Sequence, residues 1–487
     1  MKNKINSRYK SIYIPILCVL ALFGCTDDIE DINTDPLAAT EIPAALLYPQ
    51  FFLQMSSNRT IELNGVNIQS QHWASAGSAG VFSNPERYVI SPFTIGNNFT
   101  GIYTGVLRNL DLARSLTLES NPDDLNTLGQ IKTFEAFAFL HITQIYGDAP
   151  LSEAIRVDEF PNPVFDAQED MLRAIADKCD EAVALLETET GIVTDADLIY
   201  DGNRTNWIRF ANSLKLKTLM LIANVDPGSV QSEIQELVDN PLLILENSQN
   251  AYLTYPGTVN QANPIWQTLD LFAVPGTNPF WYAGSTLVNI MNDNDDPRRS
   301  TYFSDADDEV DGIQYVGQDQ GVFDPTGIST VSLDIIRPEL EDRFFTAAET
   351  NFFIAEAILK GFASGDAQAF YEAGLRASLD SYDGQPGELS SDEKEDYVAS
   401  RGSIAGLSNE DAIERVNIEQ YVALFTRGLE AWTHWRRTKT PEFQLPDNAQ
   451  LSDIIRRYGY PTDELTTNEN SPAASPDLIE PMWFENQ

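Results

Sequence analysis

The chain has 487 residues, of which 43% are hydrophobic and 10% aromatic, and it carries 31 Lys and Arg against 73 Asp and Glu, a net charge of −42. The hydrophobic and aromatic content predicts a large folded core and excludes an intrinsically disordered chain. The acidic excess repels phosphate backbones and anionic lipid, so it excludes a nucleic-acid-binding protein.

The N-terminus has the pattern of an export signal. Four cations within the first ten residues precede an apolar stretch from Ile12 to Phe23. This stretch is too short to cross a hydrocarbon core, which needs ~20 residues, and it has the length and flanks of a secretory signal. The sequence LFGC, which ends at Cys25, resembles a bacterial lipobox. We therefore expect residues 1–24 to be a signal peptide, cleaved before a lipid-modified Cys25.

The residues after Cys25 are acidic. Asp27 and Asp28 resemble the export tag of surface-exposed lipoproteins in some Gram-negative bacteria. Each buried methylene of an attached lipid adds ~0.8 kcal/mol of membrane affinity, so several chains anchor a protein without a spanning helix. We expect residues 25–40 to form a lipid-anchored tether and residues 41–487 to form one domain. Within that domain Cys179 has no cysteine partner, and its helical surroundings predict a buried, unreactive side chain.

Apolar residues at helical spacing predict a series of amphipathic helices. The clearest extends from Leu125 to Tyr146, and Gly147 is a natural stop. A first helix is expected near Pro43, and a short one near the C-terminus between Leu451 and Gly459. The remaining helices are predicted over residues 168–186, 207–225, 230–238, 346–362, 367–382 and 413–429.

The arrangement of these helices predicts a mainly α fold. Pairs of helices joined by turns resemble tetratricopeptide-like hairpins, although no strict 34-residue period is present. The segment 247–342 differs, because Pro, Gly, Asn, Asp and aromatic residues interrupt it throughout. A long irregular segment in a compact domain is usually functional. We therefore expect a helical-hairpin scaffold with an irregular, loop-rich ligand-binding lobe at about 247–342.

The sequence patterns of enzymes are missing. His72, His141 and His434 are scattered without a zinc-binding spacing, and AGSAG at Ala76 lacks the first glycine of a GxSxG elbow. The acidic stretch at Asp305 lacks the glycine and glutamate of a calcium-binding EF-hand loop. We therefore predict no catalytic residue, no metal and no cofactor. The sequence does not exclude a catalytic pair of carboxylates, because 73 acidic residues offer many pairs.

Aromatic residues in loops are the chemical theme that remains. Aromatic faces stack on the C–H faces of sugar rings, and loops carry function because they lie on the surface. We predict Trp73 and Trp281 as the main ligand contacts, with Trp266, Phe82 and Tyr282 as support. Three tryptophans on predicted helices are instead expected to pack in the core, namely Trp207, Trp432 and Trp435.

Several stretches together resemble the SusD-like branch of the SusD/RagB family of nutrient-binding outer-membrane lipoproteins. Cys25 with its acidic followers is the first of them. The others, in the order expected for the family, are DINTDP at Asp31, YTGVLRNLD at Tyr103, EAFAFLHITQIYGDAPLSEA at Glu135, DDPRRSTYF at Asp295, FFIAEAILKGF at Phe352, YEAGLRASL at Tyr371 and NIEQYVALFTRGLEAWTHWRRT at Asn417.

The resemblance implies a function. Family members are lipid-anchored on the cell surface at the outer membrane, and they act as lids on SusC-like TonB-dependent transporters. They capture oligosaccharides, or in some members oligopeptides, and catalyse no reaction. Two alternatives remain: the same lid role for oligopeptides, and a surface glycoside hydrolase. The second would need two carboxylates about 5–10 Å apart in a cleft.

Overall fold

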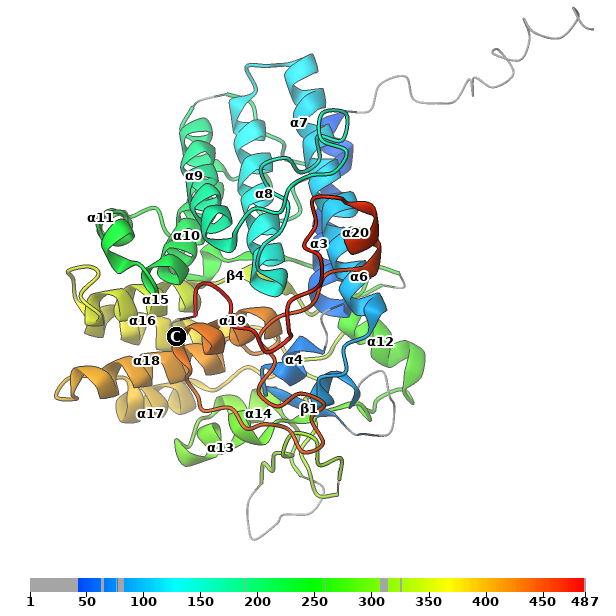
Figure 1. The fold of residues 1–487 in the computed structure, drawn as a ribbon. Coiled ribbons are helices and arrows are strands. Elements are labelled where there is room, and N and C mark those ends of the chain that lie inside the picture. The colour runs from blue at the N-terminus through cyan, green and yellow to red at the C-terminus, as the bar shows by residue number, and fades with distance from the viewer. Residues whose placement is uncertain are drawn as a thin grey trace, which may run out of the picture. The chain divides into compact units, whose positions relative to one another are not determined.

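Helices make up most of the structure (Figure 1). The computed structural model describes residues 43–485, apart from 63–64, 76, 78–82, 189, 259, 307–313 and 325, and the unit considered below is Ala44–Gln487. Cys25, Asp27 and Asp28 lie outside the described residues, and so do Phe82 and most of the acidic stretch that follows Asp305.

The helices of the first half are α3 (Tyr48–Ser57), α4 (Val66–Gln69), α6 (Pro92–Thr100), α7 (Arg108–Ser120), α8 (Leu125–Tyr146), α9 (Gln168–Leu186), α10 (Arg204–Ala223) and α11 (Pro227–Val238). Those of the second half are α12 (Pro264–Phe272), α13 (Ser285–Asp293), α14 (Arg298–Tyr302), α15 (Ala347–Leu359), α16 (Ala367–Leu379), α17 (Ser391–Arg401), α18 (Asn409–Ala423), α19 (Gly428–Thr438) and α20 (Thr462–Thr467). Short 3₁₀ or π turns are η1 (Ala44–Leu47), η2 (Asn58–Glu62), η3 (Pro85–Arg87), η4 (Gly101–Leu107), η5 (Asn247–Gln249) and η6 (Asp380–Tyr382).

The long helices form a scaffold of neighbouring hairpins. α8 packs against α7 and α9, α9 against α10, and α10 against α15, which in turn packs on α16 and α18. α8 is buried on nearly all sides, as expected for a helix that is hydrophobic all round. The predictions of α8 and α9 are confirmed at both ends. Gly147 stops α8 with φ of +77°, and its N–H donates to the Thr143 carbonyl.

Two predictions near the C-terminus are wrong. The helix predicted over 413–429 is two helices, because α18 ends at Ala423 and α19 begins at Gly428 after Thr426 adopts a positive φ. The stretch Leu451–Gly459 is not helical. Ile454 and Ile455 are both buried there although they are adjacent, and the segment contacts the C-terminal end of α8, where the Tyr458 N–H donates to the Ile145 carbonyl. Contact with α8 therefore overrides the local helical pattern.

Buried ion pairs join the scaffold helices. Glu356 of α15 accepts two hydrogen bonds from Arg437 of α19, at 2.6 and 2.5 Å, and both side chains are buried. Arg298 of α14 contacts Glu419 of α18 at 2.6 Å. The AEA, RRS and WRRT motifs of the sequence thus supply paired charges to the core rather than a ligand site. Removing one partner of such a pair costs about 3–5 kcal/mol.

The segment 247–342 holds only short elements in its described part, as predicted. Two antiparallel strand pairs help to close it. β1 (Trp73–Ser75) pairs with β3 (Trp281–Ala283), and β2 (Ala251–Leu253) pairs with β4 (Asp342–Phe345). β1, α13 and α14 lie in the lower part of Figure 1. The core predictions are confirmed, since these side chains are buried: Cys179, Trp207, Trp432 and Trp435.

Candidate functional site

Trp73 and Trp281 lie in the interior and not on the surface. Both indoles are 0% exposed, and their ring centroids are 5.5 Å apart. The prediction that these two rings are exposed is therefore wrong. The reason is the pairing of β1 with β3, which sets Trp73 opposite Ala283 and Ser75 opposite Trp281 across about two hundred residues of sequence. A ring without exposed surface cannot stack on a sugar in this conformation.

Polar contacts hold this strand pair in place. The carbonyl of Trp73 accepts a hydrogen bond from the Gln320 amide at 2.9 Å. The buried Glu86 carboxylate accepts the N–H groups of Ser75 and Gly321, at 3.1 and 3.0 Å. Burial raises the pKa of Glu86 to about 7, although both backbone donors favour its charged form. The β1–β3 pair is thus a buried element of the core that hydrogen bonds hold in place.

Tyr282 lies between the two tryptophan positions but has a different environment. It pairs with Ala74 in the register and also bridges to Thr330. Side chains alternate along a strand, so the Tyr282 ring is on the opposite face from Trp281, and it is half-buried. Tyr282 therefore keeps some surface for a ligand, as the prediction requires.

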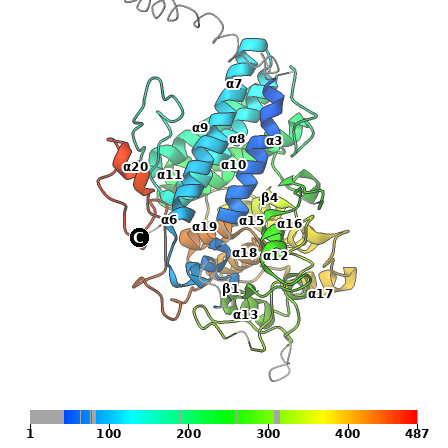
Figure 2. The same cartoon turned by 90° about the vertical axis from the view of Figure 1, so that its right-hand side faces the viewer.

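Trp266 is the predicted aromatic that lines a hollow. It lies half-buried on α12, beside a cavity of about 210 Å³ between this helix and residues 333–338. Leu269, Asp270, Thr277 and Arg337 are among the other lining residues. α12 lies at the right of Figure 1 and faces the viewer in Figure 2. We call this cavity the α12 hollow.

The walls of the α12 hollow are fixed by one residue. Asn263 caps α12 by accepting the N–H of Ile265 at 2.8 Å, and Pro264 occupies the first turn. The same Asn263 donates its backbone N–H to the Pro338 carbonyl and its side-chain amide to the Leu340 carbonyl. The helix and the facing 333–338 segment are therefore held together by hydrogen bonds.

The rim of the α12 hollow is apolar and exposed. Val274 and Leu333 line the hollow and are 71% and 40% exposed. Leu271 and Phe272, which precede Val274 at the end of α12, are 74% and 64% exposed but are not part of the lining. Exposed large apolar side chains at a cavity are typical of a binding surface. Asp270 and Arg337 add hydrogen-bonding groups to the lining. An aromatic ring, an apolar rim and a few polar groups are the composition of a small-molecule site.

Sequence reasoning proposed Trp266 as a ligand contact but did not name the residues that line the hollow with it. Arg337 lies about seventy residues further on, and it contributes because its guanidinium is held by hydrogen bonds to the Asp334 carbonyl and the Gln385 side chain. The available signal was the run LDLFAVPG, in which apolar residues continue into a Pro-Gly turn. Such a run leaves apolar side chains at a surface turn.

Two searches of the described residues concern metal clusters and membrane-spanning helices. In that part of the chain, His, Cys, Asp and Glu side chains do not gather in threes that could hold a metal ion. The three histidines are buried and apart, and burial lowers the pKa of each to about 3. No described helix is long and apolar enough to cross a membrane.

Helical hairpins with an irregular lobe define the class as a tetratricopeptide-like helical scaffold. The chain belongs to the SusD-like family described as "Starch-binding associating with outer membrane", whose model matches residues 36–461. No curated protein matches the chain.

Solved structures share the fold. A chitin-binding protein has 21% sequence identity and a TM-score of 0.79, covering 91% of this chain and 100% of its own. A SusD homologue from Bacteroides fragilis has 22% identity and a TM-score of 0.76, with coverage of 92% and 100%. A chitin-binding SusD homologue from Flavobacterium johnsoniae has 21% identity and a TM-score of 0.72, with coverage of 86% and 93%. At these identities the likeness establishes the fold.

Proposed function

We propose that this chain is a non-catalytic cell-surface lipoprotein that captures oligosaccharides and passes them to a SusC-like TonB-dependent transporter of the outer membrane. The observation that carries the sugar assignment is the α12 hollow, where Trp266 lies beside Asp270 and Arg337. The indole face suits the C–H face of a sugar, while the carboxylate and guanidinium suit its hydroxyl groups. The family description and the chitin-binding structural relatives support the same ligand class.

The size of the α12 hollow favours one sugar unit at a time. Its volume of about 210 Å³ is below the ~300–1,000 Å³ of typical drug-sized sites. The exposed rim of Val274 and Leu333 extends the apolar surface outward. We therefore propose that one ring enters the hollow while neighbouring rings of the chain lie over the rim.

Titration calorimetry with the purified protein tests the ligand class. Starch-derived maltooligosaccharides, chitin-derived oligosaccharides and peptides of similar length should be compared at one salt concentration. Binding of either glycan series and none of the peptides is the expected result. Binding of the peptides alone would establish the oligopeptide alternative. Release of new reducing ends during long incubation would instead establish the glycoside hydrolase.

The anchor and the transporter need tests in cells. Cys25→Ser should abolish labelling by a metabolic fatty acid, because serine supplies no thiolate.

Replacing Asp27 and Asp28 by alanine should protect the protein from protease added to intact cells, if these residues direct surface export. Isolation in mild detergent at native expression should recover a large transporter of the outer membrane. Repeated recovery of the lipoprotein alone would contradict the lid role.

A further inference from the structure

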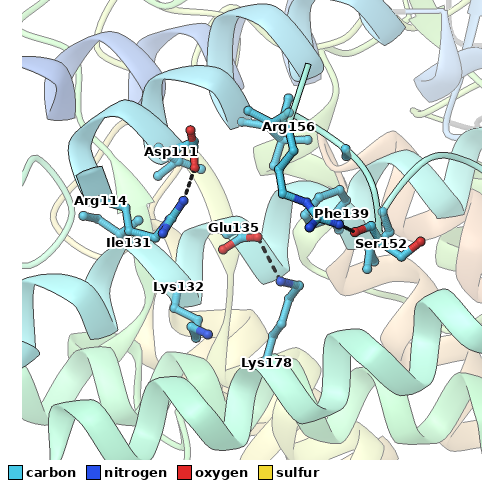
Figure 3. Close-up of a pocket in the computed structure, with 14 residues that line it drawn as sticks. Asp111, Arg114, Ile131, Lys132, Glu135, Phe139, Ser152, Arg156 and Lys178 are labelled. Atoms are coloured by element: carbon cyan, nitrogen blue, oxygen red, sulfur yellow. Dashed lines mark hydrogen bonds and ion pairs between the residues drawn. The ribbon is translucent and has the colours of Figure 1, made fainter. Parts of the chain in front are cut away.

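A second pocket lies in the helical scaffold, away from the irregular lobe. It opens between α7, α8, α9 and residues 151–156, and it has a volume of about 270 Å³. Four cations line it: Arg114 of α7, Lys132 of α8, Lys178 of α9 and Arg156. Figure 3 shows these charged side chains around one space, with Lys178 and Arg156 reaching into it from opposite sides. We call it the basic pocket.

The basic pocket is less negative than the protein as a whole. The chain carries −42, whereas the pocket lining has four cations against the two carboxylates of Asp111 and Glu135. Each cation also pairs with a carboxylate, and two of these carboxylates, Glu181 and Glu159, lie outside the lining. Cations that balance the acidic charge locally lower the repulsion of a small anion. The pocket therefore admits an anionic ligand that the remaining surface repels.

Two of the four cations have a structural role. Lys178 bonds Glu135 at 2.9 Å, and Lys132 pairs with Glu181, so each of these pairs joins α8 to α9. An ammonium has three N–H donors, and the described residues accept one from each of these lysines. Donors therefore remain for a ligand even where the lysine also holds two helices together.

The two arginines have no such structural role. Arg114 pairs with Asp111, three residues earlier on its own helix, and Arg156 bonds the Ser152 carbonyl and Glu159 within its own segment. Their side chains are 44% and 46% exposed. Neither of these bonds connects two elements. The Arg156 guanidinium also lies over the Phe160 ring, 4.5 Å from its centroid. Both arginines line the pocket, and most of the five N–H donors of each are left unused by these bonds.

The interior of the basic pocket is apolar. Leu107, Leu110, Ile131 and Phe139 lie behind the charged rim. The two lining carboxylates, Asp111 and Glu135, offer acceptor oxygens for hydroxyl groups. A single sugar unit that satisfies all three features carries one carboxylate, several hydroxyl groups and an apolar face, and further units of an oligosaccharide lie outside the pocket.

We propose that the basic pocket is a second binding site, which takes the carboxylate of an acidic sugar of the uronic-acid class. Carboxylate geometry matches the planar fork of arginine. The sugar hydroxyls face Asp111 and Glu135, and the ring lies against the apolar interior. The proposal rests on the proposed function only in taking the ligand to be a glycan. It adds a separate site and a preference for acidic glycans.

The test uses trigalacturonate and its fully methyl-esterified, neutral form. Calorimetry on the full protein at low salt should show trigalacturonate binding at least ~10-fold more tightly than the ester, and high salt should weaken the acid only. The double variant Arg114→Gln, Arg156→Gln should weaken trigalacturonate by ~10- to 100-fold. Arg376→Gln is the control for a general loss of positive charge, because Arg376 is 40% exposed, lies outside the pocket lining, and pairs with Glu372 on its own helix and with Glu395 of α17. It should leave binding unchanged, and melts should confirm that each variant folds.

The outcomes separate this proposal from the proposed function. Equal affinity for acid and ester, or unchanged affinity in the double variant, overturns the basic pocket as a carboxylate site. An equal loss in Arg376→Gln also overturns it, because the attraction would then be general. If neutral glycans bind while trigalacturonate does not, only the second site fails. If no glycan of either kind binds, the proposed function fails with it.

Discussion

Two tryptophans of the irregular lobe lie fifteen positions apart in the chain and have opposite environments. Trp281 on β3 is 0% exposed and packs beside Trp73 of β1, whereas Trp266 on α12 is half-buried and lines a hollow. Both occur among Pro, Gly and Asn residues. The difference is that Trp281 has a strand partner from a distant part of the sequence, while α12 has only one buried face. Composition alone therefore does not tell a loop tryptophan that builds the lobe from one that can meet a ligand.

The largest expected effect is the loss of stability when the buried Trp281 is replaced. Trp281→Ala should lower the free energy of unfolding by about 3–5 kcal/mol, because it leaves a large cavity beside Trp73. Urea titration measures it. Glycan affinity, measured where the variant is still folded, should stay close to that of the wild type. A variant that unfolds like the wild type but binds glycan poorly would restore Trp281 as a ligand contact.

The same contrast shows which parts of the fold and the site can be predicted from the sequence. The pattern of Leu125–Tyr146 followed by Gly147 defines α8 because every determinant is local. The burial of Trp73 depends on β3, about two hundred residues later, and no local pattern reports that pairing. The α12 hollow needs Arg337, and the basic pocket needs α7, α8, α9 and the 151–156 segment together. Helices with local determinants, such as α8, were therefore predictable, but the helix expected at 451–459 and the sites made from distant segments were not.

The stability of the fold should depend on pH through Glu86, which is bonded to the β1–β3 pair. Burial raises the pKa of Glu86 to about 7 from an unfolded value of about 4.5, so the folded state binds the proton more tightly. Its contribution to stability is present below about pH 4.5 and is lost as the pH rises to about 7, by at most ~3 kcal/mol. Glu86→Gln removes this slope, and urea titrations at about pH 5 and about pH 8 measure it.

The histidines require a correction in that experiment. Burial lowers the pKa of His72, His141 and His434 to about 3, so their contribution is lost as the pH falls below about 6.5. This slope has the opposite sign to that of Glu86. Subtracting the Glu86→Gln curve from the wild-type curve cancels it. A flat difference curve would mean that Glu86 is charged throughout, held by the N–H groups of Ser75 and Gly321.

Replacing the half-buried Trp266 should change the affinity for the ligand more than the stability of the fold. Stacking of a nucleobase on an aromatic ring is worth ~1–3 kcal/mol, and by analogy Trp266→Ala should weaken oligosaccharide binding by roughly 5- to 150-fold. Its cost in stability should be smaller than that of Trp281→Ala, since the ring is only half-buried. Trp483→Ala is the matched control, because Trp483 is also half-buried against the core but lies outside the lobe. Equal affinity for both variants would remove Trp266 from the site.

The smallest effects come from a pair of valines that differ only in environment. Val274 lines the α12 hollow and is 71% exposed, whereas Val331 is 0% exposed and donates its N–H to the Trp281 carbonyl. Val331→Ala removes two buried methyl groups and should cost about 2 kcal/mol of stability without changing affinity. Val274→Ala should change stability by less than about 0.5 kcal/mol. It should weaken glycan binding by about 2- to 4-fold, because the rim loses apolar surface that a sugar ring would cover. Melts and calorimetry measure the stability and the glycan affinity of both variants. The contrast between buried and exposed regions requires that Val331→Ala lower stability alone and that Val274→Ala lower affinity alone. If Val274→Ala leaves affinity unchanged while Trp266→Ala reduces it, the ligand occupies the hollow alone and the rim is left to another partner.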